Sequence, residues 1–546
     1  MISKVKLSIF CRLLVLFCIT TVSSQVKKDT ISLSELPLEA SPIKNSIQNS
    51  ASSVAIIGLS DIQKTDGIVL TPILNKVAGV FMQQGAMNTN RITIRGIGAR
   101  TPYGTNKIKA YFDGIPITSV NGETVVEDID VTSIERIEII KGPNSTSFGS
   151  GLGGVINLYS KATSIKESFG KYTNTFGSFG LLQQRVSGGF NDDKTNLSTS
   201  YSDLEMEGYR DNSAYKRKNF NLFGKQKIAQ KGVLRFLGMY TNQKGYIPSS
   251  LSEKDYENNP EKAATTWALS QGYETYDKFM FGLGYEHQFA DKWNLNSTVF
   301  SNFINAYEAR PFDILDDESN SVGFRFHINY KDHLFSLPFE LSFGTEMAIE
   351  NYEYELYNNL YASNPGQGSV QGELFNAANE NRNYQNYFLQ MEFILTKNLH
   401  LETGIALNST KYSLTNVFDK ATSQNETYNF GNVWTPRIGL SYKVGSGKNI
   451  YVSISKGFSV PAIAETLTPE GQINTTLKPE IGWNYEVGFK GNWLENKIYA
   501  EINLFSTQIQ NLLVARRTAN DQYVGINADS SSHPGIEFMM NYKLFE

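Results

Sequence analysis

From residue 166 to residue 546, the chain consists largely of stretches in which apolar and polar residues alternate. Ile450, Val452 and Ile454, for example, are separated by Tyr or Ser residues. Alternation with a period of two residues predicts β-strands with one apolar face. Short polar turns separate some stretches and longer connections separate others. This pattern predicts one large antiparallel sheet with short turns along one side and long loops along the other.

The turn signals set the expected number of strands. Seven short turns, one further long connection and a final run over Ile536–Phe545 predict about 16 strands. The short turns are expected near residues 192–194, 229–231, 291–292, 331–332, 397–398, 445–447 and 495–496, and the long loops near 244–275, 306–320, 355–384, 418–432 and 461–480.

Aromatic residues are abundant, with 29 Tyr and 33 Phe. After residue 24, however, no apolar run approaches the roughly 20 residues that a membrane-spanning helix needs. In a membrane β-barrel the lipid-facing residues alternate with lumen-facing ones, so the average hydropathy stays moderate. The composition therefore favours an antiparallel membrane β-barrel.

Residues 1–24 have the pattern of a secretory signal peptide. Lys4 and Lys6 form its basic end, an apolar run follows, and cleavage is expected before Gln25. Both cysteines of the chain, Cys11 and Cys18, lie in this segment, so the mature chain is expected to lack disulfides and Cys-bound metals. The mature chain would carry 47 basic residues against 54 acidic ones. This charge argues against a nucleic-acid partner.

Residues 51–162 read instead as a compact α+β domain. Its expected elements are a strand at 54–57, a helix over Asp61–Val77, and strand-bearing segments at 80–82, 92–96, 110–116 and 134–141. The last segment runs into Gly142-Pro143, a turn signal, and then into a run of glycines.

Three of these glycines, Gly149, Gly151 and Gly154, fit the spacing G-x-G-x-x-G. A dinucleotide-binding site requires this motif to open a helix in a βαβ unit. The following residues, Val155–Tyr159, have strand character instead. The pattern therefore argues against a nucleotide site.

The order of the motifs over residues 51–162 resembles the plug domain of TonB-dependent outer-membrane receptors. The residues that carry this resemblance are Arg95, Gly96, Asp113, Gly114, Lys141, Gly142, Pro143, Gly149, Gly153 and Gly154. The resemblance implies an N-terminal α+β plug domain inside the lumen of the barrel.

Barrels that hold a plug have about 22 strands. Segments at 456–461, 477–488 and 534–537 resemble parts of family barrels after which further strands follow. We therefore expect a C-terminally truncated receptor that lacks roughly six strands and has unpaired first and last strands. The expected division is a signal peptide at 1–24, a flexible tail at 25–50, the plug at 51–162 and an incomplete barrel at 163–546.

The tail contains Asp29, Thr30, Ile31, Ser32 and Leu33. An acidic residue followed by alternating apolar positions can pair as an added strand with the sheet edge of a partner. The segment resembles the TonB box of the family. This implies a TonB-type periplasmic energy-transducing protein as partner, outer-membrane lipid around the wall, and the outer membrane of a Gram-negative bacterium as location.

The resemblance also suggests residues that join the plug to the barrel. Family plugs place basic residues against barrel glutamates, and the matching positions here are Arg95, Lys141 and Glu486. Lys141 stands where arginine is common, and a lysine loses the bidentate geometry.

No sequence motif points to an enzyme. The five histidines lack ligand spacing, and nucleophile, P-loop and EF-hand motifs are absent, so no catalytic residue, cofactor or metal is expected.

The expected function is TonB-energised import of a scarce solute, most simply a ferric-siderophore or ferric-citrate chelate. The alternatives are a passive outer-membrane pore, a surface adhesin, or a haem or cobalamin receptor, although residues 459–480 lack the histidine usual in haem receptors. Candidate ligand contacts are Arg100, Tyr103, Lys107, Tyr246 and Arg310.

Overall fold

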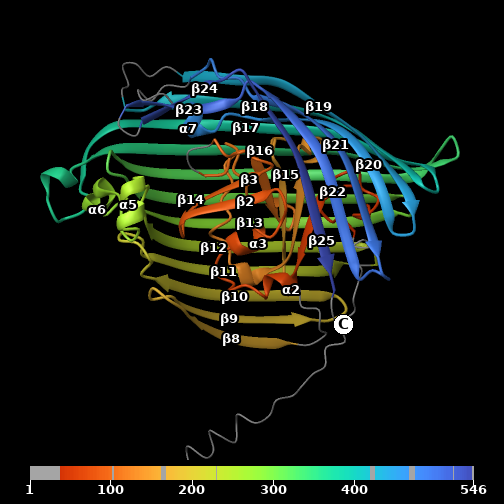
Figure 1. Ribbon diagram of the computed structural model, residues 1–546, viewed down its shortest axis with the longest axis horizontal. Helices are drawn as coiled ribbons and strands as arrows, with labels where there is room; N and C mark the ends of the chain where they lie inside the picture. The colour runs from red at the N-terminus through yellow and green to blue at the C-terminus, as the bar shows by residue number, and fades with distance from the viewer. Residues whose placement is uncertain are drawn as a thin grey trace, which may run out of the picture.

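A strongly curved sheet wraps around a smaller domain (Figure 1). The computed structural model describes residues 37–100, 104–161, 168–228, 230–418, 425–466, 474–519 and 522–543. The expected signal peptide, the expected TonB box and Tyr103 lie outside these residues. None of the helices in the described ranges is long and apolar enough to cross a membrane.

The curved sheet, called the wall below, has sixteen antiparallel strands. Neighbours in the sheet follow chain order except that a small hairpin precedes the last strand. The wall strands are β8 Phe169–Phe176, β9 Leu182–Asn191, β10 Thr195–Met206, β11 Tyr215–Ile228, β12 Gly232–Tyr246, β13 Tyr273–Ala290, β14 Trp293–Ala309, β15 Ile314–Leu334, β16 Leu337–Asn359, β17 Gln371–Thr396, β18 Leu399–Asn416, β19 Asn425–Gly445, β20 Lys448–Ser459, β21 Glu480–Trp493, β22 Ile498–Gln510 and β25 Ser530–Tyr542. This confirms the expected number and type of strands.

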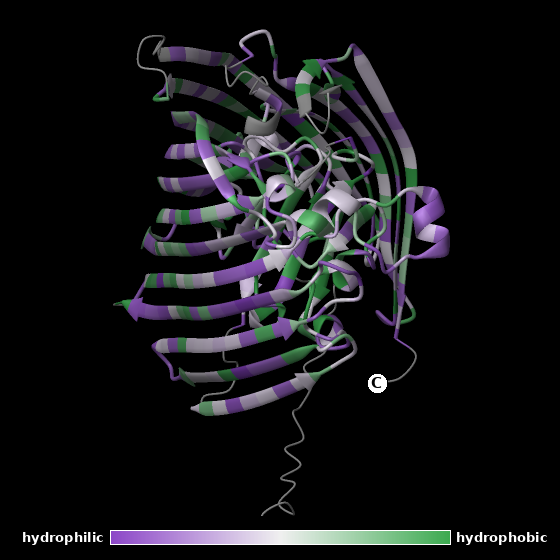
Figure 2. Ribbon diagram, turned by 90° about the vertical axis from the view of Figure 1, so that its left-hand side faces the viewer, coloured by the Kyte–Doolittle hydropathy of each residue, from purple (hydrophilic) through white to green (hydrophobic). Residues whose placement is uncertain are grey.

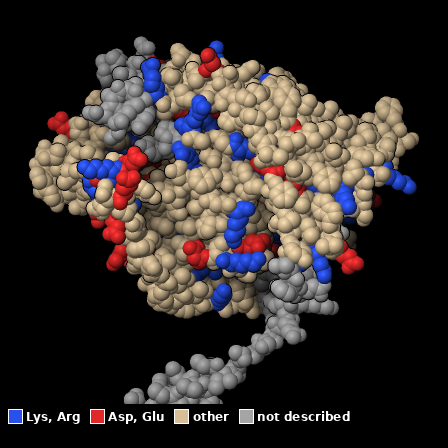
Figure 3. All heavy atoms as spheres, in the orientation of Figure 1, with Lys and Arg blue, Asp and Glu red and all other residues tan. Residues whose placement is uncertain are grey.

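The wall has its apolar side outside. In β20, Ile450, Val452 and Ile454 are exposed, whereas the alternating Tyr451, Ser453 and Ser455 are buried against the interior. The same alternation appears as bands of colour along the strands in Figure 2. Uncharged residues make up most of the face shown in Figure 3. An apolar exterior with a polar interior is typical of a barrel that sits in lipid.

Strands β8 and β25 stand at the two ends of the sheet and do not pair with each other. The expectation of unpaired first and last strands is therefore confirmed for the described residues. Their backbone donors and acceptors remain available to another strand along these edges.

The short turns lie at one end of the wall, called the short-turn end, and the long connections lie at the other, the long-loop end. Two expected long loops are wrong, because β14 to β17 continue as paired strands through most of residues 306–320 and 355–384. In these extensions of β14 to β17 the outward face is polar, as at Glu353 and Glu355, whereas Tyr354 between them is buried. The apolar outer face that signals a wall strand is therefore lost although the backbone still pairs.

The loop expected at 418–432 is wrong from Asn425 onward, where β19 begins and pairs with β18. The turn expected at 331–332 lies instead at Phe335-Ser336, where both φ angles are positive.

Two further small strands were not expected. β23 Leu513–Ala519 pairs with β24 Gln522–Asn527 to form a hairpin between β22 and β25. The long connections also carry short helices: α5 Glu253–Asn258, α6 Thr265–Ser270, η3 Tyr361–Ser363 and α7 Ile463–Thr466.

The enclosed domain, the plug, is built on a five-stranded sheet in the order β1-β6-β7-β4-β5, in which only β4 and β7 are parallel. Its hydrophobic core includes residues from nearly every plug element. The elements are β1 Val54–Gly58, α2 Leu59–Ile62, α3 Thr71–Leu74, β2 Val80–Ala86, β3 Thr89–Ile94, β4 Ile108–Phe112, β5 Ile115–Pro116, η2 Val131–Ser133, β6 Ile134–Lys141, α4 Ser145–Phe148 and β7 Gly154–Ser160.

The single helix expected over Asp61–Val77 is wrong, because the structure has two short helices, α2 and α3. Between them Asp66 accepts a hydrogen bond from the backbone N–H of Ile68, and Gly67 has a φ of +73°. A local side-chain bond and a left-handed glycine both compete with helix. Pro72 then opens α3, a position that favours proline.

The expected flexible tail is wrong over residues 37–50, called the strap below. Leu38, Ile43 and Ile47 of the strap are buried. The wall residue Lys490 donates to the carbonyl oxygens of Ile47 and Ser50, at 2.6 Å each. The strap lies in place because wall side chains satisfy its backbone and because its apolar side chains are covered.

Candidate functional site at the plug–wall interface

Arg95 and Gly96 form a two-residue turn at the end of β3. Ile94 and Ile97 exchange backbone hydrogen bonds across it, and both central residues have positive φ, 55° and 76°. A turn of this kind requires φ > 0 at both central positions. It projects the Arg95 side chain out of the plug towards the wall, which explains why an arginine precedes a glycine at this point.

Arg95 lies between two wall carboxylates. Its Nη1 is 2.7 Å from Oε2 of Glu486 in β21, and its Nη2 is 3.1 Å from Oε2 of Glu537 in β25. The guanidinium also stacks on the ring of Phe505, 4.0 Å from its centroid. Burial alone would lower the pKa of Arg95, but Glu486 and Glu537 outweigh it and the pKa is raised. The expected proximity of Arg95 and Glu486 is present in the structure.

Lys141, the second expected basic residue, contacts Glu537 rather than Glu486. Its Nζ lies 2.8 Å from Oε2 of Glu537 and 3.1 Å from the carbonyl oxygen of Ala78. The two cations and two carboxylates form one buried cluster, called the lock below. Sequence reasoning missed Glu537 as a member. Its position between the exposed Ile536 and Phe538 in an alternating strand was the available signal that it faces inward.

Further ion-pair junctions attach the plug to the wall, among them Asp128 with Lys278 and Asp130 with Arg185. Lys109 Nζ of β4 contacts Oε1 of Glu346 in β16 at 2.5 Å, and the same carboxylate accepts a hydrogen bond from Tyr111 at 2.9 Å. Burial lowers the pKa of Lys109, although Glu346 opposes this. Burial and Glu346 together raise the pKa of Tyr111 well above its ordinary value.

Lys107, expected as a ligand contact, forms another junction. It lies 3.4 Å from Glu465 and 3.3 Å from Glu480 and is buried. Burial lowers its pKa, but the two carboxylates outweigh burial and the pKa is raised above its ordinary value. The geometry places Lys107 in a charged plug–wall contact rather than on an open surface.

The other expected ligand residues are not gathered in one place. Arg100 is exposed on the plug, whereas Tyr246 lies at the long-loop end of the wall beside Tyr273. Arg310 forms ion pairs with Asp313, at 2.6 Å, and with Glu308. Among the described residues, no group of three His, Cys, Asp or Glu side chains is placed to hold a metal ion.

The glycine run is shaped by close packing and not by a nucleotide. It leads from α4 into strand β7, so it does not open a helix. Gly154 has a φ of +142°, and a Cβ there would clash with the carbonyl oxygen of Ile140. A Cβ at Gly149 would clash even more closely with the hydroxyl of Tyr384 in the wall. Asp113 and Gly114 form a second tight turn with positive φ, and Asp113 Oδ1 accepts from the N–H of Ser160 at 3.0 Å.

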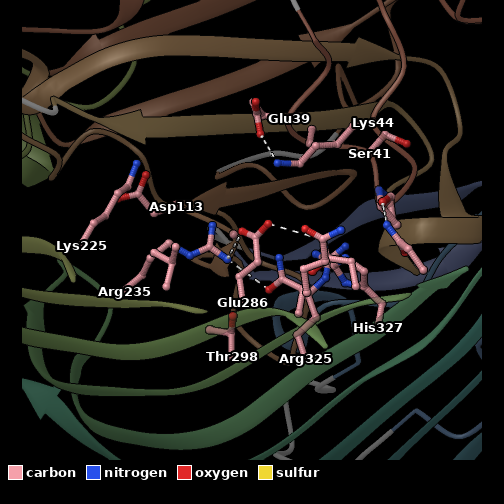
Figure 4. A pocket seen from close by; sticks show the side chains of 18 of the residues that line it. Glu39, Ser41, Lys44, Asp113, Lys225, Arg235, Glu286, Thr298, Arg325 and His327 are labelled. Atoms are coloured by element: carbon pink, nitrogen blue, oxygen red, sulfur yellow. Dashed lines mark hydrogen bonds and ion pairs between the residues drawn. The ribbon is translucent and has the colours of Figure 1, made fainter. Parts of the chain in front are cut away.

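A cavity of about 880 Å³ lies between the plug and the wall at the short-turn end (Figure 4). Strands β11 to β16 line one side, the ends of the plug strands line another, and strap residues 39–44 line a third. Figure 4 shows Arg235 and Glu286 pointing towards each other inside it, with Thr298 and His327 nearby. Most of its lining residues are charged or polar, and its volume is within the range of small-molecule sites.

Family models match nearly the whole chain. The TonB dependent receptor-like beta-barrel matches residues 143–546 and the TonB-dependent Receptor Plug Domain matches residues 46–155. Among curated proteins, the Ferric-pyoverdine 358 receptor of Pseudomonas putida is 25% identical over 278 residues, which cover 44% of this chain and 32% of that protein. The match therefore spans about a third of that relative. The Vitamin B12 transporter BtuB of Photobacterium profundum is 22% identical over 92% of this chain and 74% of its own length.

Solved structures share the fold. The unliganded ferric citrate transporter FecA superposes with a TM-score of 0.75 at 16% identity, over 91% of this chain and 75% of that one. The pyoverdine receptor FpvA of Pseudomonas aeruginosa PAO1, bound to pyoverdine, gives a TM-score of 0.77 at 15% identity, over 95% of this chain and 79% of that one. With a plug sheet, a sixteen-strand wall and a family match over far more than half of its length, the chain belongs to the TonB-dependent receptor family.

Proposed function

We propose that this protein is an outer-membrane receptor of a Gram-negative bacterium that imports a scarce solute with energy from a TonB-type periplasmic protein. One observation carries the proposal: the plug is joined to the wall by buried ion pairs, of which Arg95–Glu486 in the lock is the most enclosed. Removing one partner of such a pair costs roughly 3–5 kcal/mol, so spontaneous release of the plug is unfavourable. A passive pore or an adhesin has no use for such an obstruction, whereas an energised importer needs one that force can release.

The energy would enter through residues 29–33. In this proposal they pair as an added strand with the sheet edge of the partner, and the pull passes along the strap to the plug. The strap begins only a few residues after Leu33 and contacts both the wall and the plug. At the short-turn end of the wall, the partner would approach from the periplasm, with lipid around the apolar exterior.

The solute we propose is a ferric chelate. The structural similarity to FecA and FpvA, described as a ferric citrate transporter and a pyoverdine receptor, supports this choice. Arg100, Tyr246 and Arg310 are the candidate contacts. Cobalamin is the second candidate, because the vitamin B12 transporter of Photobacterium profundum aligns with 92% of the chain.

A deletion separates these possibilities. Cells that lack their own receptors and express this chain would be given radiolabelled ferric citrate, ferric pyoverdine or cyanocobalamin. Deleting residues 29–33 should abolish uptake of the true solute while its binding to cells on ice is retained. Uptake that survives the deletion would contradict energised import, and the identity of the labelled solute taken up by the intact chain decides between the two candidates.

A further inference from the structure

The cavity at the short-turn end contains two cationic side chains that no ion pair neutralises. Nine Lys or Arg side chains line it. Seven of them form ion pairs, such as Lys44 with Glu39 at 3.0 Å and Lys231 with Asp291 at 3.1 Å, and the partners of three lie just outside the lining. Within the described residues, Lys225 and Lys227 have no ion-pair partner and are exposed. Unpaired charges of one sign in a cleft concentrate solutes of the opposite sign.

Buried polar atoms in the lining also lack partners. Asn157 of β7 is only 4% exposed and Asn329 of β15 only 7%, and both line the cavity. In the described structure, neither Nδ2 of Asn157 nor Oδ1 of Asn329 has a hydrogen-bond partner. A buried polar atom without a hydrogen-bond partner is destabilising, so these atoms favour a polar occupant.

The strap forms one side of the cavity. Asn329 donates to the carbonyl oxygen of Pro42 at 2.6 Å, and the N–H groups of Glu39 and Ala40 donate to the plug residue Glu138. Any pull on the chain before residue 37 acts first on these contacts. Displacement of the strap would then open the cavity on that side.

We propose that this cavity is a second, transient binding site for an anionic, hydrogen-bonding solute on its way past the plug, and that strap residues 39–44 close it. The solute is held by the unpaired ammonium groups of Lys225 and Lys227 and by the free amide atoms of Asn157 and Asn329. This inference rests on the proposed function, since it assigns an intermediate binding site to the same imported solute.

The charge of the cavity can be measured without knowing the solute. Thr298 lines the cavity, and the only native cysteines are Cys11 and Cys18, which can be replaced by serine. The purified full chain with Thr298→Cys, in lipid nanodiscs, would be treated with a sulfonate-bearing or a trimethylammonium-bearing methanethiosulfonate reagent. Ser363→Cys, at the exposed end of the short helix η3, provides the reference for the intrinsic reactivity of the two reagents.

Relative to Ser363→Cys, the anionic reagent should modify Thr298→Cys about tenfold faster than the cationic one, at the low end of what a charged cleft produces. Lys225→Glu combined with Lys227→Glu should remove this preference, whereas the two Lys→Arg changes should keep it. Millimolar citrate, used as the probe anion, should slow modification at Thr298→Cys and leave Ser363→Cys unaffected.

The proposal is overturned if Thr298→Cys reacts no faster with the anionic reagent than with the cationic one, relative to Ser363→Cys. It is also overturned if citrate does not slow the modification of Thr298→Cys. The outcome is separate from that of the proposed function. A chain that passes this test but keeps its uptake after deletion of residues 29–33 has the cavity site without energised import. A chain that imports its solute but fails the test lacks the second site.

Discussion

Arg95 of the plug and Glu486 of the wall form a bidentate pair, in which Nη1 lies 2.7 Å from Oε2 and Nη2 lies 3.3 Å from Oε1. Their side chains are 0% and 2% exposed. With Glu537 and Lys141, two positive charges oppose two negative ones in a space closed to water. Any single removal therefore leaves a buried charge without compensation, which is more costly than the pair itself is stabilising.

Replacement of Arg95 by alanine should loosen the plug. We expect the plug to lose about 3–5 kcal/mol of seating free energy, because Glu486 would stay buried without its partner. The measurement is calorimetric unfolding of the plug in the detergent-solubilised protein, together with entry into cells of a large antibiotic that the outer membrane normally excludes. Arg100→Ala, at an exposed plug arginine, should change neither.

The double variant Arg95→Met with Glu486→Met gives the stricter test of the lock. It removes one charge of each sign, so it should destabilise the plug less than Arg95→Met alone. The lock is not an electrostatic unit if the plug of the double variant is less stable than that of Arg95→Met. The same conclusion follows if the plug of Arg95→Ala is as stable as that of the parent protein and admits no more antibiotic.

Ile31→Pro should stop uptake of the solute while leaving its binding to the cell surface intact. Proline lacks the N–H needed for strand pairing with the periplasmic partner. Ile31→Val keeps both the N–H and the branched side chain and should transport normally. Uptake and binding on ice would be compared for the three proteins, and equal uptake by the proline variant would argue against strand addition at this position.

The sequence was sufficient to predict the wall, because one apolar face per strand produces a visible alternation. In β20 and β22 the expected outward residues, such as Ile450 and Ile502, are indeed exposed. The alternation is lost where β15 and β16 extend beyond the part of the wall with an apolar exterior, because no outward-facing residue there needs to contact lipid. It also fails in the strap, whose position depends on hydrogen bonds from distant residues such as Lys490.

The site was partly predictable for a similar reason. Arg95 and Glu486 could be named because the motifs around them resemble family segments. Glu537, Lys109 and Glu346 were missed, because their partners lie 237 to 442 residues away along the chain and no local pattern records such pairs. The cavity at the short-turn end arises from three separate segments and has no linear signature.

Two plug glycines should respond very differently to alanine. At Gly154 a Cβ would clash with the carbonyl oxygen of Ile140, and φ is +142°, so Gly154→Ala should prevent the plug from forming its sheet. At Gly114 φ is +81° but no atom lies within 4 Å of the new Cβ, so the cost should be limited to about 1–2 kcal/mol of backbone strain. Protease resistance of the plug in the purified protein would rank the two variants. Similar resistance would mean that close packing at Gly154 is not required.

Lys490 should hold the strap in place from the wall side. The residue is fully buried, and its ammonium donates to the carbonyl oxygens of Ile47, Ser50 and Ser52.

Lys490→Met keeps the length of the side chain but leaves these oxygens without their donor. Because each buried acceptor left unpaired costs about 1–3 kcal/mol, amide hydrogens of residues 37–53 should exchange at least tenfold faster. Lys448→Met, on the neighbouring strand β20, removes a lysine whose ammonium lies over the ring of Trp493 and should leave exchange in the strap unchanged. If the amide hydrogens of the strap exchange equally slowly in both variants, the apolar residues Leu38, Ile43 and Ile47 alone hold the strap in place. A pull from the periplasm would then have to break that apolar contact rather than the hydrogen bonds of Lys490.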